Sequence, residues 1–318
     1  MQVLITGGAG YIGSNLARRL LAGGHGVILF DNLSTSLPRN LRDLAGRAKL
    51  VSGDILDLSH LLRAARDNSI QRIVHTAAVV SVPVSMERPL YTAKLNIEGS
   101  LNVFETARLF AIDRVVNVSS AEAYGAFQQD PAPEDHPLNS TTPYGITKAA
   151  VERFGNHYSD HHGIHYVAVR ISYAYGVGHP RSTLPKPWME DALAGRRTVV
   201  PRGGDQLIDF TCVEDTVEGL RLVVEAPHLE HRAYNIASGH AVTLREAADQ
   251  IQRLVPGWKY EIGPGLPEQS PGYIAPLKGS LDISRAGREL GYRPKYDLAT
   301  GFRRYLESLR EDMAANDR

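Results

Sequence analysis

MQVLITGGAGYIGSNLARRLLAGGHGVILFD, residues 1–31, is the stretch that decides the fold of this chain. Residues 2–6 are an apolar and β-branched run typical of a buried strand, and the run stops at the glycine-rich turn of residues 7–10. Over residues 11–21, apolar side chains recur at helical spacing until two glycines end the pattern. Residues 27–30 form a second apolar run. The stretch therefore predicts a strand, a tight turn, a helix and a second strand.

The same stretch predicts a dinucleotide site. Gly7 and Gly10 allow the backbone to approach a pyrophosphate at the helix N-terminus, where free N–H groups and the helix dipole favour negative charge. Gly13 allows the helix to pack closely on the sheet. Asp31 ends the second strand, where it can accept hydrogen bonds from both hydroxyls of an adenosine ribose and would repel a 2′-phosphate. No Lys or Arg lies between Asp31 and Arg39, which favours NAD over NADP.

Length and composition narrow the class of protein. With 318 residues, the chain can form one large α/β domain or a nucleotide domain with a smaller lobe. The 35 basic and 35 acidic residues give no net charge, which argues against a nucleic-acid or membrane-surface partner. The single cysteine, Cys212, excludes an intrachain disulfide and is expected to be a buried small residue rather than a nucleophile. No apolar window is long enough for a membrane span, so we expect a cytoplasmic protein.

Strand and helix patterns alternate after Asp31, which predicts a doubly wound parallel sheet of the α/β Rossmann class with ligands at the carboxyl ends of its strands. We expect a Rossmann domain over residues 1–172, to which 206–237 return, and a smaller α/β substrate-binding lobe from residues 173–205 and 238–318. The further predicted strands are 49–52, 72–75, 114–118, 165–170 and 233–236, and the predicted helices include 57–66, 90–110, 188–194 and 243–254.

Tyr144 and Lys148 are four positions apart at the start of a predicted helix, so they share one face. A free tyrosine, with a pKa of about 10, is a poor base at neutral pH unless its pKa falls by about 3 units, or about 4 kcal/mol. An ammonium about 4 Å away supplies roughly that energy at an effective dielectric constant of 20. We therefore expect Tyr144 to take a proton from a substrate hydroxyl, with Lys148 as its electrostatic partner and Ser120, at the end of a strand, as a ligand of that hydroxyl.

With these motifs the chain resembles the extended short-chain dehydrogenases/reductases of the NAD-dependent epimerase/dehydratase type, the group of UDP-galactose 4-epimerase. The resemblance covers nearly the whole chain. It implies transient oxidation of a sugar carbon by bound NAD, and a homodimer formed through a four-helix bundle of the helices around 96–110 and 144–158. The matching motifs are TGGAGYIGS (6–14), DNLST (31–35), GDI (53–55), HTAA (75–78), NIEGSLNV (96–103), SSAEAYG (119–125), YGITK (144–148) and YNIASG (234–239).

The resemblance also implies the residues of the site. The expected cofactor-binding residues are Gly7, Gly10, Tyr11, Ile12, Asp31, Asn32, Ser34, Asp54, Ile55, Thr76, Ala77, Ala78, Asn96, Val118, Tyr144 and Lys148. The expected substrate-binding residues are Ser81, Ser120, Ala121, Glu122, Tyr173 and Arg181. No metal site is expected, because His75, His165 and His179 lack the spacing of metal ligands.

The chain departs from the family pattern where a nucleotide diphosphate would be bound. Nucleotide-sugar members usually carry an asparagine where this chain has Tyr173, and arginines where it has Ile208 and Ser270. Two negative charges need cationic or bidentate partners, so these departures leave a nucleotide-sugar substrate open to question. The cations that could substitute are Arg181, Lys186, Arg196, Arg197, Arg202 and Lys278.

Glu122 is a fourth candidate catalytic residue. In the family, a glutamate two residues after the catalytic Ser or Thr acts as a base in dehydratases and decarboxylases; dehydratases add an acid at the intervening position, which here is Ala121. Dehydration is therefore disfavoured. We expect an NAD-dependent sugar-modifying enzyme, foremost a nucleotide-sugar 4-epimerase-like one. The alternatives are a dehydrogenase of a free sugar, sugar acid or polyol, a nucleotide-sugar decarboxylase using Glu122, and a non-catalytic NAD-binding protein.

Overall fold

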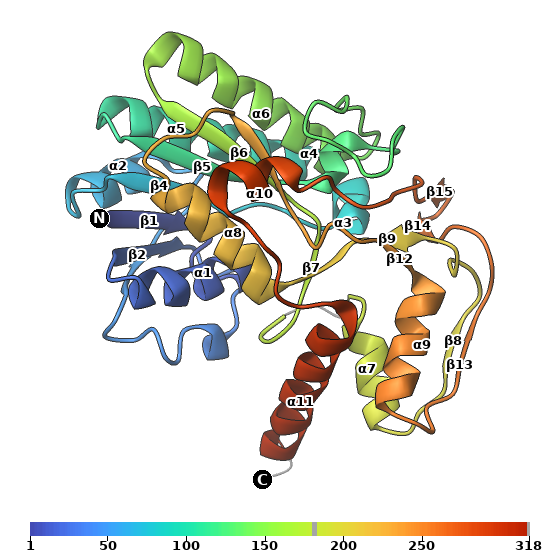
Figure 1. Ribbon diagram of the computed structural model, residues 1–318. Helices are drawn as coiled ribbons and strands as arrows, with labels where there is room; N and C mark the ends of the chain where they lie inside the picture. The colour runs from blue at the N-terminus through green and yellow to red at the C-terminus, as the bar shows by residue number, and fades with distance from the viewer. Residues whose placement is uncertain (180–182, 317–318) are drawn as a thin grey trace.

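A computed structural model, which describes residues 1–179 and 183–316, is built around a seven-stranded parallel sheet (Figure 1). The strand order is β3-β2-β1-β4-β5-β6-β11, so the chain starts in the middle of the sheet and winds outward in both directions. The strands are β1 (Gln2–Thr6), β2 (Gly26–Asp31), β3 (Lys49–Ser52), β4 (Arg72–His75), β5 (Arg114–Ser120), β6 (His165–Ile171) and β11 (Ala233–Ile236). This topology confirms the predicted doubly wound Rossmann fold.

Helices cover both faces of this sheet (Figure 1). One face packs against α1 (Tyr11–Ala22), α8 (Val213–Glu225) and α10 (Ser284–Leu290), and the other against α2 (Leu58–Arg66), α5 (Gly99–Leu109) and α6 (Pro143–His162). Alternation along β1 shows why two apolar cores form: Val3 and Ile5 belong to one cluster and Leu4 to the other. Buried on both faces, the strands need continuous apolar runs, which is the pattern that the sequence carries.

The predicted helix over residues 90–110 is wrong as a single α-helix. The structure has α4 (Pro89–Ala93), a π-helical turn η2 (Lys94–Glu98) and then α5. The N–H of Gly99 donates to the carbonyl oxygen of Lys94, a step of five residues instead of four. The apolar spacing on either side is still helical, so periodicity could not reveal the extra residue. Asn96 lies within this turn and is buried.

The predicted strands 2–6, 49–52, 72–75 and 233–236 match the structure, and the remaining predicted boundaries differ from it by one or two residues. Strands β5 and β6 continue past the predicted ends at residues 118 and 170, because they pair with each other as far as Ser120 and Ile171. The helix predicted at 188–194 is α7 (Lys186–Leu193), and the one predicted at 243–254 is α9 (Leu244–Leu254), with Thr243 as its N-cap. The predicted helix 57–66 is α2 with Asp57 as its N-cap.

A third apolar cluster lies beyond the carboxyl edge of the main sheet, where Figure 1 shows α7, α9 and α11 (Leu298–Asn316) apart from the other helices. Trp188, Phe210, Trp258 and Phe302 are buried in it. Its short strands are β7 (Tyr173–Tyr175) with β10 (Phe210–Cys212), β9 (Leu207–Ile208) with β12 (Val242–Thr243), β8 (Thr198–Val200) with β13 (Tyr260–Ile262), and β14 (Glu268–Ser270) with β15 (Tyr273–Ile274). This separate core agrees with a second lobe, whose exact chain boundaries stay a prediction.

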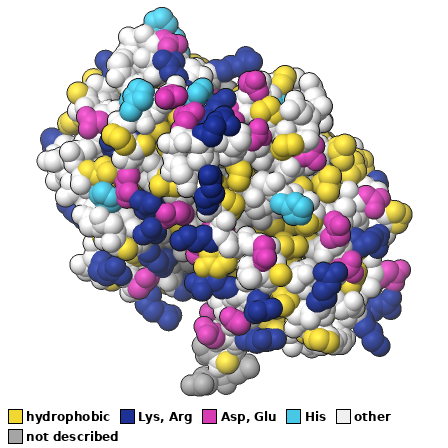
Figure 2. Space-filling model, viewed as in Figure 1, with side chains coloured by type: hydrophobic (Ala, Val, Ile, Leu, Met, Phe, Trp, Pro, Cys, Tyr) yellow, Lys and Arg dark blue, Asp and Glu magenta, His cyan; other side chains and the backbone are white. Residues whose placement is uncertain are grey.

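The surface is mixed in charge. On the face shown in Figure 2, Lys and Arg side chains are interspersed with Asp and Glu, as the balanced composition leads one to expect. Cys212 is buried, as predicted; its thiol donates to Glu214 Oε2 at 2.8 Å, and burial raises the pKa of the thiol. Within residues 1–179 and 183–316, no helix combines the length and the apolarity that crossing a bilayer requires.

Candidate functional site

The glycine-rich turn between β1 and α1 forms a tight cradle at the carboxyl edge of the sheet. Gly7 has a φ of +66° and its N–H donates to Phe30 O at 2.8 Å. A Cβ on Gly13 would lie 2.4 Å from Gly7 O, so only glycine lets α1 begin this close to the turn. Gly10 is the N-cap of α1 and supplies no side-chain cap. The first N–H groups of α1, with Tyr11 and Ile12 in its first turn, are therefore suited to bind an anion.

Asp31 ties this turn to the end of β2. Its buried carboxylate accepts hydrogen bonds from Ala9 N at 2.9 Å (Oδ2) and from Leu33 N at 2.8 Å (Oδ1). Beside it, Asn32 Nδ2 donates to Asp54 Oδ2 at 3.0 Å. The residues expected around an adenosine thus meet at the ends of β2 and β3. The Ser34 N–H donates to Asn32 Oδ1 at 3.1 Å, which extends the same group.

The segment after β4 is fixed by side-chain hydrogen bonds. Thr76 Oγ1 donates to Thr6 O at 2.7 Å, which holds this segment to β1 beside Gly7. Asn96, from the π-helical turn, accepts from Val79 N at 2.8 Å and donates to Val79 O at 3.1 Å, and it also donates to Thr147 Oγ1 at 2.9 Å. Asn96 therefore joins this segment to α6. Farther along, Ser81 is the N-cap of α3 (Val82–Glu87).

Tyr144 and Lys148 lie in the first turns of α6, which Pro143 and the N-cap Thr142 begin. Both are buried, and Lys148 Nζ lies 5.9 Å from the centre of the Tyr144 ring. The ammonium donates to the carbonyl oxygen of Val118 at 2.7 Å. Burial lowers the pKa of Lys148 to about 8, and the nearby Glu152 carboxylate partly offsets this effect. The side-chain pair predicted from its spacing is thus brought together.

Ser120 and Glu122 approach α6 from the end of β5. The Glu122 N–H donates to Ser120 Oγ at 3.1 Å, at the start of the 3₁₀ turn η3 (Ala121–Tyr124). This turn packs on α6, where a Cβ on Gly145 would lie 2.4 Å from Glu122 O. Ser120, Glu122 and the first turn of α6 therefore lie at one edge of the sheet.

These features fit a dinucleotide. The glycine cradle leaves no room for a Cβ at Gly7 or Gly13, α1 presents its N-terminus, and Asp31 is held at the end of β2. A family profile described as "NAD dependent epimerase/dehydratase family" matches residues 3–237. The chain belongs to this family. As a member of the NAD-dependent epimerase/dehydratase family, it is an enzyme that uses NAD.

Individual relatives of the same family extend over the whole chain. The chain is 32% identical over 317 residues to the UDP-glucose 4-epimerase of Mycolicibacterium smegmatis, covering 98% of this chain and 99% of that protein. The crystal structure of a Thermotoga maritima UDP-glucose 4-epimerase with UDP-glucose has 28% identity and a TM-score of 0.88, covering 98% of this chain and 100% of that chain. A Thermus thermophilus UDP-glucose 4-epimerase in complex with NAD has 28% identity and a TM-score of 0.86, covering 98% and 99%.

The expected substrate-binding residues and the departures from the family pattern lie in different parts of the structure. Arg181 lies outside the described residues. Tyr173 is in β7, with its ring 5.4 Å from that of Phe210. Ile208 is paired in β9 with Val242, and Ser270 is in β14 opposite Tyr273. The three departures from the family pattern lie on short strands outside the seven-stranded sheet, and Tyr173 is next to the Ile208 segment because its N–H donates to Asp209 O at 3.2 Å.

The described cations that could replace the missing diphosphate ligands all have protein partners. Four of them bind groups of the second lobe or its neighbouring loop: Lys186 to His179 O, Arg196 to Asp191, Arg197 to Glu261, and Arg202 to Leu266 O. The fifth, Lys278, reaches the other lobe and binds the η3 turn beside Ser120. Sequence reasoning named Lys278 only as a possible diphosphate ligand, because no motif signals a contact across more than a hundred residues of chain.

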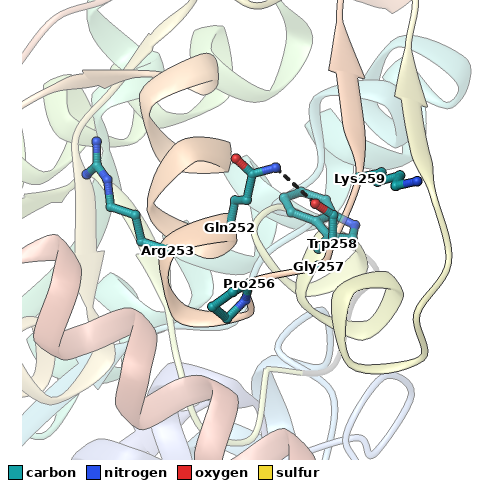
Figure 3. Close-up of a pocket in the computed structure, with 6 residues that line it drawn as sticks. All are labelled: Gln252, Arg253, Pro256, Gly257, Trp258 and Lys259. Atoms are coloured by element: carbon teal, nitrogen blue, oxygen red, sulfur yellow. Dashed lines mark hydrogen bonds between the residues drawn. The ribbon is translucent and has the colours of Figure 1, made fainter.

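Two hollows in the described surface lie away from Ser120, Tyr144 and Lys148. A shallow one of about 510 Å³ is lined by the end of α9 and the loop after it, where Gln252 Nε2 donates to Trp258 O at 2.9 Å (Figure 3). A groove of about 670 Å³ between α1, α8 and α11 is lined by paired charges such as Arg19 with Glu218 and Arg304 with Glu214. Neither contains Ser120, Tyr144 or Lys148.

His75 and the group around Glu289 are bonded to protein atoms. His75 is buried between Thr6 Oγ1 at 2.7 Å and Ser100 Oγ at 2.9 Å, and burial lowers its pKa to about 3, which fits the predicted structural role. His231 and Glu289 form an ion pair at 2.9 Å, with Glu230 close by. Tyr234 also donates to Glu289. We assign no metal to this group.

Proposed function

We propose that the protein is a nucleotide-sugar 4-epimerase-like enzyme that oxidises a sugar hydroxyl transiently. The observation that carries this proposal is that Lys148 Nζ lies 5.9 Å from the centre of the Tyr144 ring and is hydrogen-bonded to Val118 O, on the strand that ends at Ser120. Relatives named UDP-glucose 4-epimerase that match almost the full length support the same reaction. The intact set of three residues argues against a non-catalytic NAD-binding protein.

In this proposal Tyr144 accepts the proton of the substrate hydroxyl. NAD, which the glycine-rich turn and Asp31 would hold, would supply a reversible acceptor for the hydride of the same carbon. The Lys148 ammonium, whose Nζ lies 5.9 Å from the centre of the Tyr144 ring, stabilises the phenolate by Coulomb attraction and so lowers the free energy needed for Tyr144 to act as a base. Ser120 Oγ, held by the Glu122 N–H, orients the reacting oxygen.

A second candidate function is net dehydrogenation of a free sugar, sugar acid or polyol. It is favoured by the residues Tyr173, Ile208 and Ser270 in place of diphosphate ligands. The protein partners of the described candidate cations favour it further, because a paired cation has fewer donors left for a phosphate. Decarboxylation remains a weaker alternative, in which Glu122 would serve as base.

The test is a turnover screen of the NAD-loaded protein against UDP-, dTDP-, GDP- and CDP-sugars beside free aldoses and aldonates. The 4-epimerised nucleotide sugar without net NADH supports the proposed function, whereas steady NADH release from an unphosphorylated compound supports the second candidate. Tyr144→Phe should abolish either activity. Tyr158→Phe is the matched control, because Tyr158 lies on the same helix and its hydroxyl donates to Glu105 Oε1 at 2.6 Å. Full turnover by Tyr144→Phe would refute the mechanism.

We also propose a homodimer formed through α5 and α6. Leu109 and Phe110 at the end of α5, and Ile146 and Phe154 on α6, are each at least 40% exposed. Large exposed apolar side chains on adjacent helices are typical of an interface. The double variant Ile146→Glu with Phe154→Glu should give monomers in light scattering. Val199→Glu, at an apolar residue that is 58% exposed in the second lobe, is the control. We further propose that the protein is cytoplasmic, and that residues 173–205 and 238–318 form the substrate-binding lobe.

A further inference from the structure

Lys278 lies between β15 and α10, on the stretch that Figure 1 shows running back from the second lobe towards α10. Its side chain is only 13% exposed. The ammonium donates to Gly125 O at 2.8 Å and to Ala121 O at 3.4 Å, and it lies 3.5 Å from Glu122 Oε2. The ammonium thus contacts one segment of the Rossmann domain, residues 121–125.

That segment is the one that holds Ser120. The Glu122 N–H donates to Ser120 Oγ, and the Gly125 N–H closes the turn by donating to Glu122 O at 3.2 Å. On its other side the turn rests against Gly145, next to Tyr144. The distance between the Ser120 hydroxyl and the first turn of α6 therefore depends on the conformation of residues 121–125.

The backbone around Lys278 is itself fixed against the Rossmann domain. Phe127 N donates to Leu277 O at 3.0 Å, and Ala132 N donates to Ser280 O at 2.9 Å. Ser280 Oγ donates to Asp130 Oδ1 at 2.8 Å. The Lys278 ammonium lies 5.3 Å from the centre of the Phe127 ring. The lysine is therefore held in place before any substrate binds, and little side-chain entropy remains to be lost.

We propose that Lys278 is a positioning residue for the catalytic Ser120, acting through the carbonyl oxygens of Ala121 and Gly125 and the carboxylate of Glu122. This inference rests on the proposed function for its kinetic consequence. Burying an ammonium has a free-energy cost, and a hydrophobic side chain could fill the same space. A methionine there would leave two carbonyl groups and one carboxylate without their donor, and the turn would relax towards other conformations.

The test compares Lys278→Met with Lys278→Arg, using Lys259→Met as the matched control because Lys259 is an exposed lysine of the same lobe. Lys278→Met should lower kcat for epimerisation about 10- to 100-fold, the range expected for a small misplacement of a catalytic group. KM and NAD affinity should stay within about twofold of the wild type, since no substrate contact is removed. Lys278→Arg, which keeps the charge and offers five donors, should recover most of kcat.

A second measurement does not depend on turnover. Amide hydrogen exchange of a peptide covering residues 119–127 should be faster in Lys278→Met than in the wild type and unchanged in Lys259→Met. A wild-type kcat in Lys278→Met, or unchanged exchange in this peptide, would overturn the inference. A loss of kcat that Lys278→Arg does not restore would also overturn it. If the wild type converts no nucleotide sugar, the proposed function fails, while the exchange result still decides whether Lys278 orders the turn.

Discussion

Lys148 Nζ and the carbonyl oxygen of Val118 are joined by a 2.7 Å hydrogen bond in the interior of the protein. The bond runs from α6 to β5, so the side chain that would stabilise the Tyr144 phenolate is anchored to the strand that carries Ser120. An ammonium held there loses most of its hydration, which is why its pKa falls to about 8.

The activity should therefore decline at alkaline pH. Lys148 is charged below its pKa of about 8, and the ammonium that stabilises the phenolate is lost as the pH rises through this value. We expect kcat/KM to fall above pH 8 in the wild type. In Lys148→Arg the remaining activity should fall only at higher pH, because a guanidinium stays charged. If kcat/KM fell at the same alkaline pH in both proteins, a group other than Lys148 would cause the decline.

The same pKa predicts a pH-dependent stability. Between about 8, the pKa of Lys148 in the folded protein, and about 10.5, the ordinary value, the unfolded chain binds a proton that the folded protein has released. The free energy of unfolding contributed by this site therefore rises with pH across that window, by at most about 3 kcal/mol. Urea unfolding of the wild type and Lys148→Met at pH 7 and pH 10 should show the wild type gaining relative to the variant. A constant difference would contradict the burial of a charged lysine.

Replacing Asn96 should loosen the segment after β4. Asn96→Ala leaves the partly buried N–H and C=O of Val79 without their side-chain partners and removes the buried bond to Thr147. We expect a loss of about 2–4 kcal/mol in unfolding free energy, together with weaker NAD binding. Asn102→Ala is the control, because Asn102 makes one hydrogen bond, to Ile55 O at 2.9 Å, worth about 1 kcal/mol. Equal losses of unfolding free energy in the two variants, measured by urea unfolding, would argue that Asn96 does not hold the segment after β4 in place.

Gly13→Ala should disturb the nucleotide cradle. The added Cβ would lie 2.4 Å from Gly7 O and 2.8 Å from Gly8 Cα, both backbone atoms that can move only with the turn. We expect about 1–3 kcal/mol of destabilisation and a clear loss of NAD affinity in a fluorescence titration. Gly23→Ala, at the other end of α1, has a φ of −82° and meets no atom closer than 3.3 Å. It should bind NAD like the wild type.

The buried pair of Arg170 and Glu152 should be far more sensitive to mutation than a surface pair. Arg170 binds both oxygens of Glu152, with Nη2 to Oε2 at 2.6 Å, and the two side chains are 6% and 5% exposed. Arg170→Met leaves a buried carboxylate without its partner, at a cost of about 3–5 kcal/mol. Arg108→Met, in the more exposed pair with Glu105, should cost at most about 1 kcal/mol. Thermal unfolding of both variants checks this ranking.

Local signals in the sequence predicted the sheet and the nucleotide turn. The strands are apolar runs because both faces of a parallel sheet are covered, and the glycines are needed where backbone atoms approach each other. Tyr144 and Lys148 were found because their spacing places them on one face of a helix. These inferences depend on residues that are close together along the chain.

Features that depend on distant contacts were missed. The π-helical turn at Lys94–Glu98 keeps the apolar spacing of a normal helix, so periodicity did not reveal it. Lys278 looked like a free cation, whereas the fold brings it to Gly125 at 2.8 Å. Whether a charged side chain contacts solvent, substrate or other protein groups depends on its neighbours in the fold. The sequence alone does not identify those neighbours.

The bonds between the Lys278 stretch and the turn after β5 also affect the order in which parts of the protein fold during synthesis. Domains generally begin to fold from the N-terminal side during synthesis. The cradle, the sheet strands β1 to β6 and helix α6 can all form once residue 171 has left the ribosome. The partners of Ala121 and Gly125 emerge more than a hundred residues later. A nascent chain would thus acquire its nucleotide-binding fold well before the contacts of Lys278 hold the turn after Ser120.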